Sequence, residues 1–172
     1  MTNRYFKTVP ATMEHVDFLS ENMAEADVKE VFVSSGRTPR EVLVESLDIC
    51  QKVYVIVEMT KGEPFAIGGY THAGICWFLC SNKVETFNKA ERISFRAELE
   101  LNLEKALKVH PKLWNFIWSG NPAHIRFTES CGARLGNPIL GINNEVYVPF
   151  EFLREDFEDI PFEDPWEDNE DV

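Results

Sequence analysis

Two histidines are the side chains of this chain best suited to proton transfer, because an imidazole titrates near neutral pH. His72 precedes Ala73-Gly74, so we expect it in a turn between two strands, as a general base or as a plain exposed residue. His124 follows Asn121-Pro122, so we expect it near a helix N-terminus, where the helix dipole lowers an imidazole pKa. A packing or capping role is the alternative for His124.

Other catalytic constellations are missing from the sequence. No Ser-His-Asp arrangement is apparent, and the four cysteines contain no Cys-x-x-Cys pair. We therefore expect free thiols, with neither a metal site nor a disulfide framework.

The element that positions His124 is a strand followed by a short helix. Leu113 to Trp118 is an aromatic and β-branched run typical of a buried strand. Asn121 is a good N-cap and Pro122 fits the first helical position, so a helix should begin at residue 122. Gly132 can close that helix with a left-handed cap.

Upstream, three apolar runs at 53–58, 65–70 and 75–80 predict an antiparallel meander. A long helix is expected from about Glu85 to Val109, ended by Pro111. With the strands at 75–80 and 113–118 it would form a crossover between parallel neighbours. Its predicted apolar face consists of Ile93, Ala97, Leu99, Leu101, Leu103, Ala106 and Leu107, with the charged residues between them facing water.

The N-terminal part of the sequence predicts a strand at 5–9, followed by helices. Thr12 opens a first helix, and a second apolar set follows at 28–32 before Gly36 interrupts it. Thr38, with Pro39 and with Glu41 three residues on, is a capping box. The order of elements indicates an α/β (α+β) fold with a mixed, mostly antiparallel central sheet and helices on both faces.

The negative charge is concentrated at the C-terminus. Of a net charge of −12, −10 falls in residues 151–172, so residues 1–150 are nearly neutral. No basic stripe is present, and we expect no direct binding to nucleic acid. The apolar runs are too short for a membrane span, and the N-terminus lacks a signal-peptide apolar region. We expect no membrane association, and a protein kept in a reducing cytosol.

The segment from Asn121 to Gly132 resembles the last block of the GCN5-related N-acetyltransferase (GNAT) superfamily, with its spacing kept. A more particular resemblance is to the GNAT-like proteins of short-tailed bacteriophages, the family named internal virion protein A and also described as phage acetyltransferases. It is carried by Phe65 to Gly69, Cys76 to Phe78 and Trp114 to Phe127, and covers residues 1–150, which we expect to form the GNAT-like domain.

The resemblance implies acetyl-CoA as cofactor. In GNAT proteins the two parallel strands splay into a V, the pantetheine arm lies in the gap, and the pyrophosphate sits on the N-terminus of the crossover helix. Carried over to this sequence, the implied cofactor-binding residues are Leu79, Ser81, Asn82, Lys83, Val84 and Asn121.

Two departures from the family pattern bear on catalysis. Thr128 stands where the tyrosine general acid belongs, and Ala133 where a phenylalanine belongs. The loop before the long helix has no glycine and carries Glu85 where phosphates would bind. Glu58 ends a strand in a region where GNAT enzymes place a base, although a solvated strand end explains it equally well. The catalytic candidates are therefore Thr128, His72 and Glu58.

The acidic segment 151–172 contains regularly spaced aromatic residues, a composition typical of segments that fold onto a partner. Phe157, Phe162 and Trp166 are candidate anchors for a phage or host protein, whereas Phe152 is expected to pack on the body. Alternatives are that the later aromatics also pack on the body, or that the segment mimics DNA.

Two functions fit these observations. The first is a phage-encoded GNAT-fold accessory protein in virion assembly or host takeover, without catalysis, in the cytoplasm of the infected bacterium or associated with the phage particle. The second is an active acyl-CoA-dependent N-acetyltransferase that acts on an amine of a host or phage protein, using strand amides to polarise the thioester.

Overall fold

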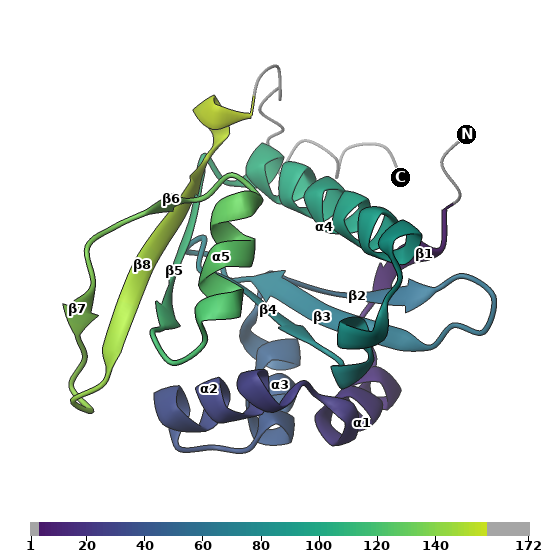
Figure 1. Cartoon of the computed structure of the whole chain (residues 1–172), viewed down its shortest axis with the longest axis horizontal. Helices are drawn as coiled ribbons and strands as arrows, with labels where there is room; N and C mark the ends of the chain where they lie inside the picture. The colour runs from purple at the N-terminus through teal and green to yellow at the C-terminus, as the bar shows by residue number, and fades with distance from the viewer. Residues whose placement is uncertain (1–3, 158–172) are drawn as a thin grey trace.

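The computed structural model describes residues 4–157, in which groups of helices and groups of strands follow one another along the chain (Figure 1). In chain order they are β1 (Phe6–Pro10), α1 (Met13–Asn22), α2 (Glu25–Ser35), α3 (Pro39–Ile49), β2 (Lys52–Glu58), β3 (Pro64–Tyr70), β4 (Cys76–Cys80), the 3₁₀ helix η1 (Asn82–Thr86), α4 (Lys89–Val109), β5 (Lys112–Trp118), α5 (Pro122–Ser130), β6 (Arg134–Leu135), β7 (Ile139–Leu140), β8 (Val146–Leu153) and the 3₁₀ helix η2 (Arg154–Asp156). No helix among these residues is both long and apolar enough to cross a bilayer.

The first sheet has the order β1-β2-β3-β4, with every pair antiparallel. Val55 lies opposite Ile67, and Gly68 lies opposite Phe78. The meander expected from the three apolar runs is therefore confirmed. All of β3 is buried, which fits its almost uninterrupted apolar sequence.

The second sheet has the order β5-β8-β6, and β7 also pairs with β8. Residues 151–153 of β8 lie opposite residues 112–114 of β5. The domain boundary expected at residue 150 therefore falls inside a strand. Phe152 is buried in the core beside Phe150, as expected, because alternate residues of β8 face the same side.

The two sheets meet at one end only. Ile75 forms a single parallel bridge with Trp114, whose N–H donates to the Gly74 carbonyl at 3.0 Å. Beyond it, Asn115 Nδ2 donates to the Cys76 carbonyl at 2.8 Å, and no further ladder joins β4 to β5 among the described residues. The strands thus diverge into the V-shaped splay expected of the fold (Figure 1).

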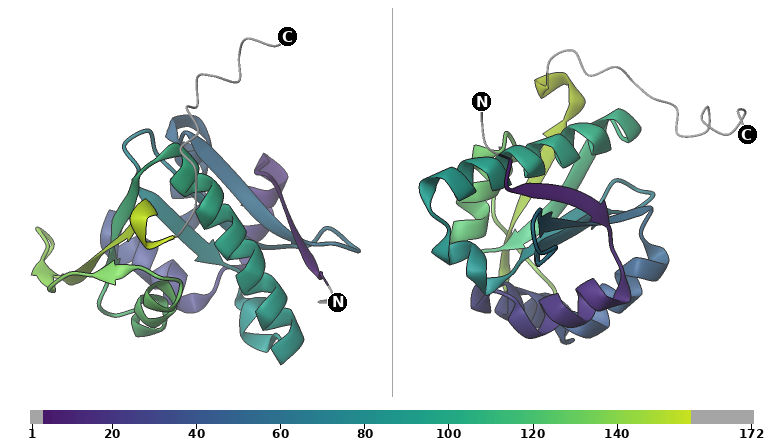
Figure 2. Two further views of the ribbon diagram at one scale, coloured as in Figure 1. Left: turned by 90° about the horizontal axis from the view of Figure 1, so that it is seen from above. Right: turned by 90° about the vertical axis from the view of Figure 1, so that its right-hand side faces the viewer.

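Helices cover both faces of the first sheet (Figure 2). On one face, Val16 and Leu19 of α1 and Leu43 of α3 pack against Val55 and Ile67. On the other face, Phe95 of α4 packs with Phe6, Phe65 and Phe87 in one aromatic cluster. The sheet is therefore the middle layer of three.

The start of α3 agrees with the sequence. Thr38 Oγ1 accepts a hydrogen bond from the Glu41 N–H at 3.3 Å, and Pro39 is the first helical residue. Gly36 ends α2 at φ 68°, a left-handed conformation that glycine adopts without strain.

The crossover helix starts later than expected, at Lys89 instead of about Glu85. Residues 82–86 form η1, which the Ser81 hydroxyl caps by accepting from the Lys83 N–H at 3.2 Å. Phe87 then turns into the core in an extended conformation, so the helix cannot pass through it, and Asn88 becomes the N-cap of α4.

The face that α4 buries also differs from the expectation. Ile93 and Leu101 are 51% and 38% exposed, whereas Glu98 is only 5% exposed. Glu98 is buried because β1 lies beside it: Thr8 Oγ1 donates to its carboxylate at 2.7 Å, and Arg4 pairs with it. The expected burial of Leu99, Ala106 and Leu107 is confirmed, whereas Ala97 is exposed and Leu103 half-buried.

Candidate functional site

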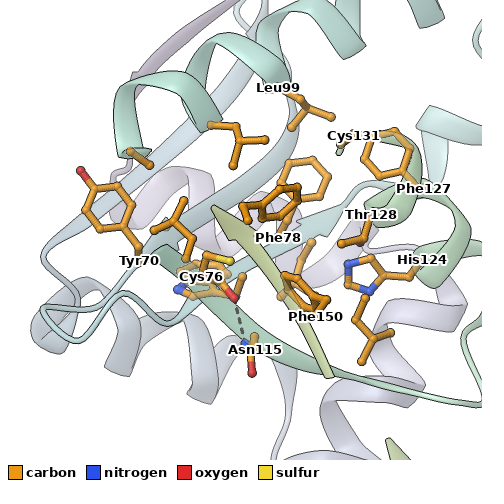
Figure 3. Close-up of a pocket in the computed structure, with 18 of the residues that line it drawn as sticks. Tyr70, Cys76, Phe78, Leu99, Asn115, His124, Phe127, Thr128, Cys131 and Phe150 are labelled. Atoms are coloured by element: carbon orange, nitrogen blue, oxygen red, sulfur yellow. Dashed lines mark hydrogen bonds between the residues drawn. The ribbon is translucent and has the colours of Figure 1, made fainter. Parts of the chain in front are cut away.

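A cavity of about 370 Å³ occupies the region where β4 and β5 diverge (Figure 3). Its walls are mostly apolar and come from β3, β4, β5, β8, α4 and α5. Residues labelled around it in Figure 3 include Tyr70, Cys76, Phe78, Leu99, Asn115, His124, Phe127, Thr128, Cys131 and Phe150. The divergence of the two strands therefore creates a concave site at the place where the fold resemblance puts a ligand.

The cavity reaches both sides of the first sheet. Phe78 of β4 packs with the aromatic cluster under α4, whereas Trp77 packs with α1 and α3 on the opposite face. Both residues line the cavity, as do Glu30 of α2 and Tyr54 of β2. The cavity thus passes through the gap between the sheets.

Few groups around the cavity are chemically reactive. Burial raises the pKa of the Cys76 thiol to about 12 and raises the pKa of the Tyr54 hydroxyl above its usual value. Both side chains are therefore neutral at physiological pH and are poor nucleophiles. The indole Nε1 of Trp77 is buried without a hydrogen-bond partner among the described residues.

A polar cluster joins α2 to α5 at one edge of the cavity. Asn121 Nδ2 donates to Glu30 Oε2 at 2.8 Å and to Asp27 Oδ1 at 3.2 Å. His124 Nδ1 lies 3.4 Å from the same Glu30 oxygen. Asn121, only 3% exposed, is the N-cap residue of α5 that the sequence predicted, but its side chain makes no cap hydrogen bond and binds α2 instead.

The cluster perturbs two titrating groups. Burial raises the pKa of Asp27, although hydrogen bonds from Cys80 and Asn121 oppose that shift. Burial would lower the pKa of His124, but the hydrogen bond and charge of Glu30, with the charge of Asp27, outweigh it and raise the pKa.

Asp27 and Glu30 were not singled out from the sequence. They stand three residues apart, a spacing that places both on one helix face, and such a pair on a polar helix is usually solvated. Their partners Asn121 and His124 are more than 90 residues away in the chain. No local signal connects the two pairs.

The edge of β4 that faces the gap is partly paired within the chain, at Cys76 and Cys80. Ser81 and Ile75 make the hydrogen bonds to β3, so Cys76, Phe78 and Cys80 present their backbone groups to the gap. The Cys80 N–H donates to Asp27 Oδ2 at 2.8 Å, and the Cys80 carbonyl accepts from the Ala24 N–H at 2.9 Å.

The three catalytic candidates do not come together. Thr128 is buried and lines the cavity. Glu58 lies at the β2–β3 turn, where it accepts from the N–H groups of Thr60 and Lys61 at 2.6 and 2.7 Å, which lower its pKa. His72 is exposed in the β3–β4 turn. Neither Glu58 nor His72 lines the cavity.

The expected cofactor residues are similarly dispersed. Leu79 lines the cavity, whereas Ser81 is fully buried as the cap of η1. Lys83 forms an ion pair with Glu63 on the surface, and Asn82 beside it is exposed. Val84 packs against the aromatic cluster under α4.

The start of α4 does not fit a pyrophosphate. Asn88 Oδ1 accepts from the Glu91 N–H at 2.9 Å, and the Glu91 carboxylate accepts from the Asn88 N–H at 3.2 Å. This capping box uses two of the N–H groups at the start of the helix and places a carboxylate at its positive end, which disfavours an anion there. The N–H and carbonyl of Cys80, which border the expected place of the pantetheine arm, are likewise hydrogen-bonded within the chain. The chain's own groups therefore occupy some of the donors that an acetyl-CoA would use, and binding of the acetyl-CoA that the resemblance implies stays a prediction.

Comparison with known proteins supports the phage resemblance. A family described as "Bacteriophage T7, probable scaffold protein Gp13" matches residues 54–138. The protein "Probable scaffold protein gp13" of Escherichia phage T7 is 38% identical over 72 residues, which cover 42% of this chain and 51% of that protein. The match thus spans about half the length of that relative. The expected resemblance to a phage protein is confirmed.

Solved structures with the same fold are GNAT acetyltransferases. A spermidine N-acetyltransferase chimera from Vibrio cholerae and hSSAT has a TM-score of 0.63 at 8% identity, covering 89% of this chain and 98% of the other. AAC(6')-Ib in complex with ribostamycin and coenzyme A has a TM-score of 0.62 at 17% identity, with 90% and 97% covered. A GNAT protein from Chromobacterium violaceum has a TM-score of 0.65 at 11% identity, with 90% and 86% covered. The chain has the GNAT fold, and sequence identities this low show a shared fold but no shared function.

Proposed function

We propose that this protein is a non-catalytic accessory protein of phage particle assembly, acting in the cytoplasm of the infected bacterium and associating with the particle. The similarity to a phage scaffold protein supports the setting. The observation that carries the loss of catalysis is that the chain's own carboxylates and amide bind the Cys80 N–H of β4 and two N–H groups at the start of α4, near the expected place of an acyl-CoA.

The pairing of residues 23–27 with β4 is central to this proposal. Met23 forms an antiparallel bridge with Ser81, and Ala24 and Asp27 bind the backbone of Cys80. An acyl-donor arm entering the gap at this level would have to displace buried hydrogen bonds, each of which stabilises a folded protein by about 0.5–1.5 kcal/mol. A GNAT fold whose gap is occupied in this way acts as a structural scaffold and not as an enzyme.

The acid–base groups also support the loss of catalysis. Thr128 has an alcohol hydroxyl, which is far too weak an acid to replace a tyrosine as proton donor. The nearby thiol of Cys76 has a raised pKa, and the candidate bases Glu58 and His72 lie outside the cavity.

Calorimetric titration of acetyl-CoA into the full chain tests the loss of the cofactor site. We expect no saturable heat and no shift of the melting temperature at millimolar ligand, with AAC(6')-Ib as the positive control. Micromolar binding, together with transfer of the acetyl group to any amine, would overturn the proposal in favour of an N-acetyltransferase.

The assembly role needs a separate experiment in infected cells. Deletion of the gene from its phage should lower the yield of infectious particles or change their protein composition, measured by plaque titre and mass spectrometry of purified particles. Complementation with a Thr128→Val chain should restore the yield, because no catalysis is required. Normal particles without the gene would contradict the proposal.

The tail aromatics remain candidate contacts for a phage or host protein. Phe157 packs against Phe152 and lies beside Gly132, so it is part of the body. Phe162 and Trp166 lie outside the described residues, and their role in partner binding stays a prediction.

A further inference from the structure

We propose that Asp27, Glu30, Asn121 and His124 form a binding site for one divalent transition-metal ion, with Zn²⁺ as the best-fitting probe. A carboxylate oxygen of Asp27, one of Glu30 and a ring nitrogen of His124 all lie within 4.8 Å of one another. Carboxylates and imidazole are common zinc ligands. The proposal is independent of the assembly role and of acetyl-CoA.

The spacing of one pair of ligand atoms, from His124 and Glu30, is compatible with a shared metal ion. His124 Nδ1 and Glu30 Oε2 are 3.4 Å apart. A charged N–H···O hydrogen bond is usually about 2.7–2.9 Å long. By contrast, two ligands about 2.0–2.1 Å from a tetrahedral zinc ion are about 3.3 Å apart.

A second observation comes from Asn121, which is almost completely buried and directed at the cluster. Its Nδ2 contacts both carboxylates, while no described residue donates to its carbonyl oxygen. Rotation of the amide by 180° would exchange its nitrogen and oxygen, so that the oxygen could join the two carboxylates in binding a cation. Asn121 would then be the fourth ligand.

The surroundings also resemble those of a structural metal site. The Cys80 N–H binds Asp27 Oδ2 and leaves Oδ1 directed at Asn121, so the backbone fixes the orientation of this ligand. Glu30 and His124 line the cavity, which provides a route for the ion.

The position of the site gives the ion a structural role. Asp27 and Glu30 belong to α2, which packs on α3 and binds Cys80 of the first sheet, whereas Asn121 and His124 lie at the start of α5, which follows β5 of the second sheet. Among the described residues, one backbone bridge, Ile75–Trp114, and the Asn115–Cys76 hydrogen bond join the strands of the two sheets. A bound ion would link α2 to α5 across the gap between the two sheets.

Titration of Zn²⁺ into the chelator-treated full chain tests the proposal. We expect binding of one ion per chain with a raised melting temperature, and much weaker binding of Mg²⁺. Glu30→Gln and His124→Gln should each weaken binding by more than the roughly 10–100-fold that loss of an outer-shell partner causes. His72→Gln, which changes an exposed histidine outside the cluster, is the matched control and should bind like the parent.

The Asn121→Asp variant distinguishes a metal site from a cluster that is held together by hydrogen bonds alone. The variant should unfold at a lower temperature than the parent without metal, because a third carboxylate replaces the amide donor, and Zn²⁺ should more than restore the difference. Absence of saturable Zn²⁺ binding by the parent would overturn the proposal. So would equal binding by the parent and the His124→Gln variant, or an Asn121→Asp variant that Zn²⁺ fails to stabilise.

Discussion

At the scale of single residues, the polar seam between β1 and α4 shows how a carboxylate can replace an apolar core residue. Glu98 accepts from Thr8 Oγ1 at 2.7 Å, and the same hydroxyl accepts from Asn102 Nδ2 at 2.7 Å. One threonine therefore satisfies two buried polar groups.

Replacement of Thr8 by valine, which has nearly the same shape, should lower the free energy of unfolding by about 1–3 kcal/mol, because Glu98 and Asn102 lose their shared partner. Urea unfolding followed by circular dichroism measures this value. Thr86→Val is the matched control: its hydroxyl bonds only to the Lys83 carbonyl at the surface, so a change within about 0.5 kcal/mol is expected. Equal losses in both variants would show that the seam contributes little.

The sequence identified only half of the polar cluster. Asn121 and His124 stood out because they surround Pro122 at a helix start. Asp27 and Glu30 gave no signal, since an acidic pair on an exposed helix face is common and only the tertiary structure brings it to Asn121. The same limitation hid Glu98, because an alternation of charged and apolar residues on α4 does not reveal that β1 lies beside it.

At the scale of elements, the start of α4 depends on competition between caps that look alike in sequence. Ser81, Asn82, Thr86 and Asn88 are all acceptable caps. Burial of Phe87 among Phe6 and Phe65 decides between them, and this long-range contact is not visible locally. By contrast, Thr38-Pro39 has no such competitor, and α3 begins as expected.

Asn88→Ala should therefore destabilise the protein by about 1 kcal/mol, the usual effect of losing an N-cap. Thermal and urea unfolding provide the measurement. Asn82→Ala is the control, because Asn82 is exposed and its side chain makes no hydrogen bond within residues 4–157. A larger effect at Asn82 than at Asn88 would contradict the helix start given by the structure.

At the scale of the whole molecule, the body extends past the end of β8. Arg134 donates to Asp156 through Nε at 2.8 Å and through a second guanidinium nitrogen at 2.6 Å, and Phe157 packs on Phe152. The acidic composition of residues 151–172 concealed this continuation, because β8 keeps its alternating apolar residues inside an acidic run. The three strands of the meander were predictable, because their apolar residues and the turn residues between them are local features of the sequence.

A chain that ends at Arg154 should therefore be less stable than a chain that ends at Phe157, by about 1–2 kcal/mol from the lost apolar burial of the phenylalanine ring. Urea unfolding of the two chains tests this difference. Phe157→Ala in the full chain should reproduce most of the loss. If all three proteins unfold at the same urea concentration, the packing of Phe157 is unimportant.

The separation of the sheet into two parts has a consequence for cooperativity. Residues 6–80 complete the first sheet and residues 112–153 the second, so each half is nearly continuous in sequence. With one parallel bridge between them, the second half can open without breaking the hydrogen bonds of the first. Native-state hydrogen exchange in low urea should then give two groups of amides with different opening free energies, and a single common value would mean that the halves unfold together. In the proposed assembly role, one half of the protein would then loosen while the other half stays folded.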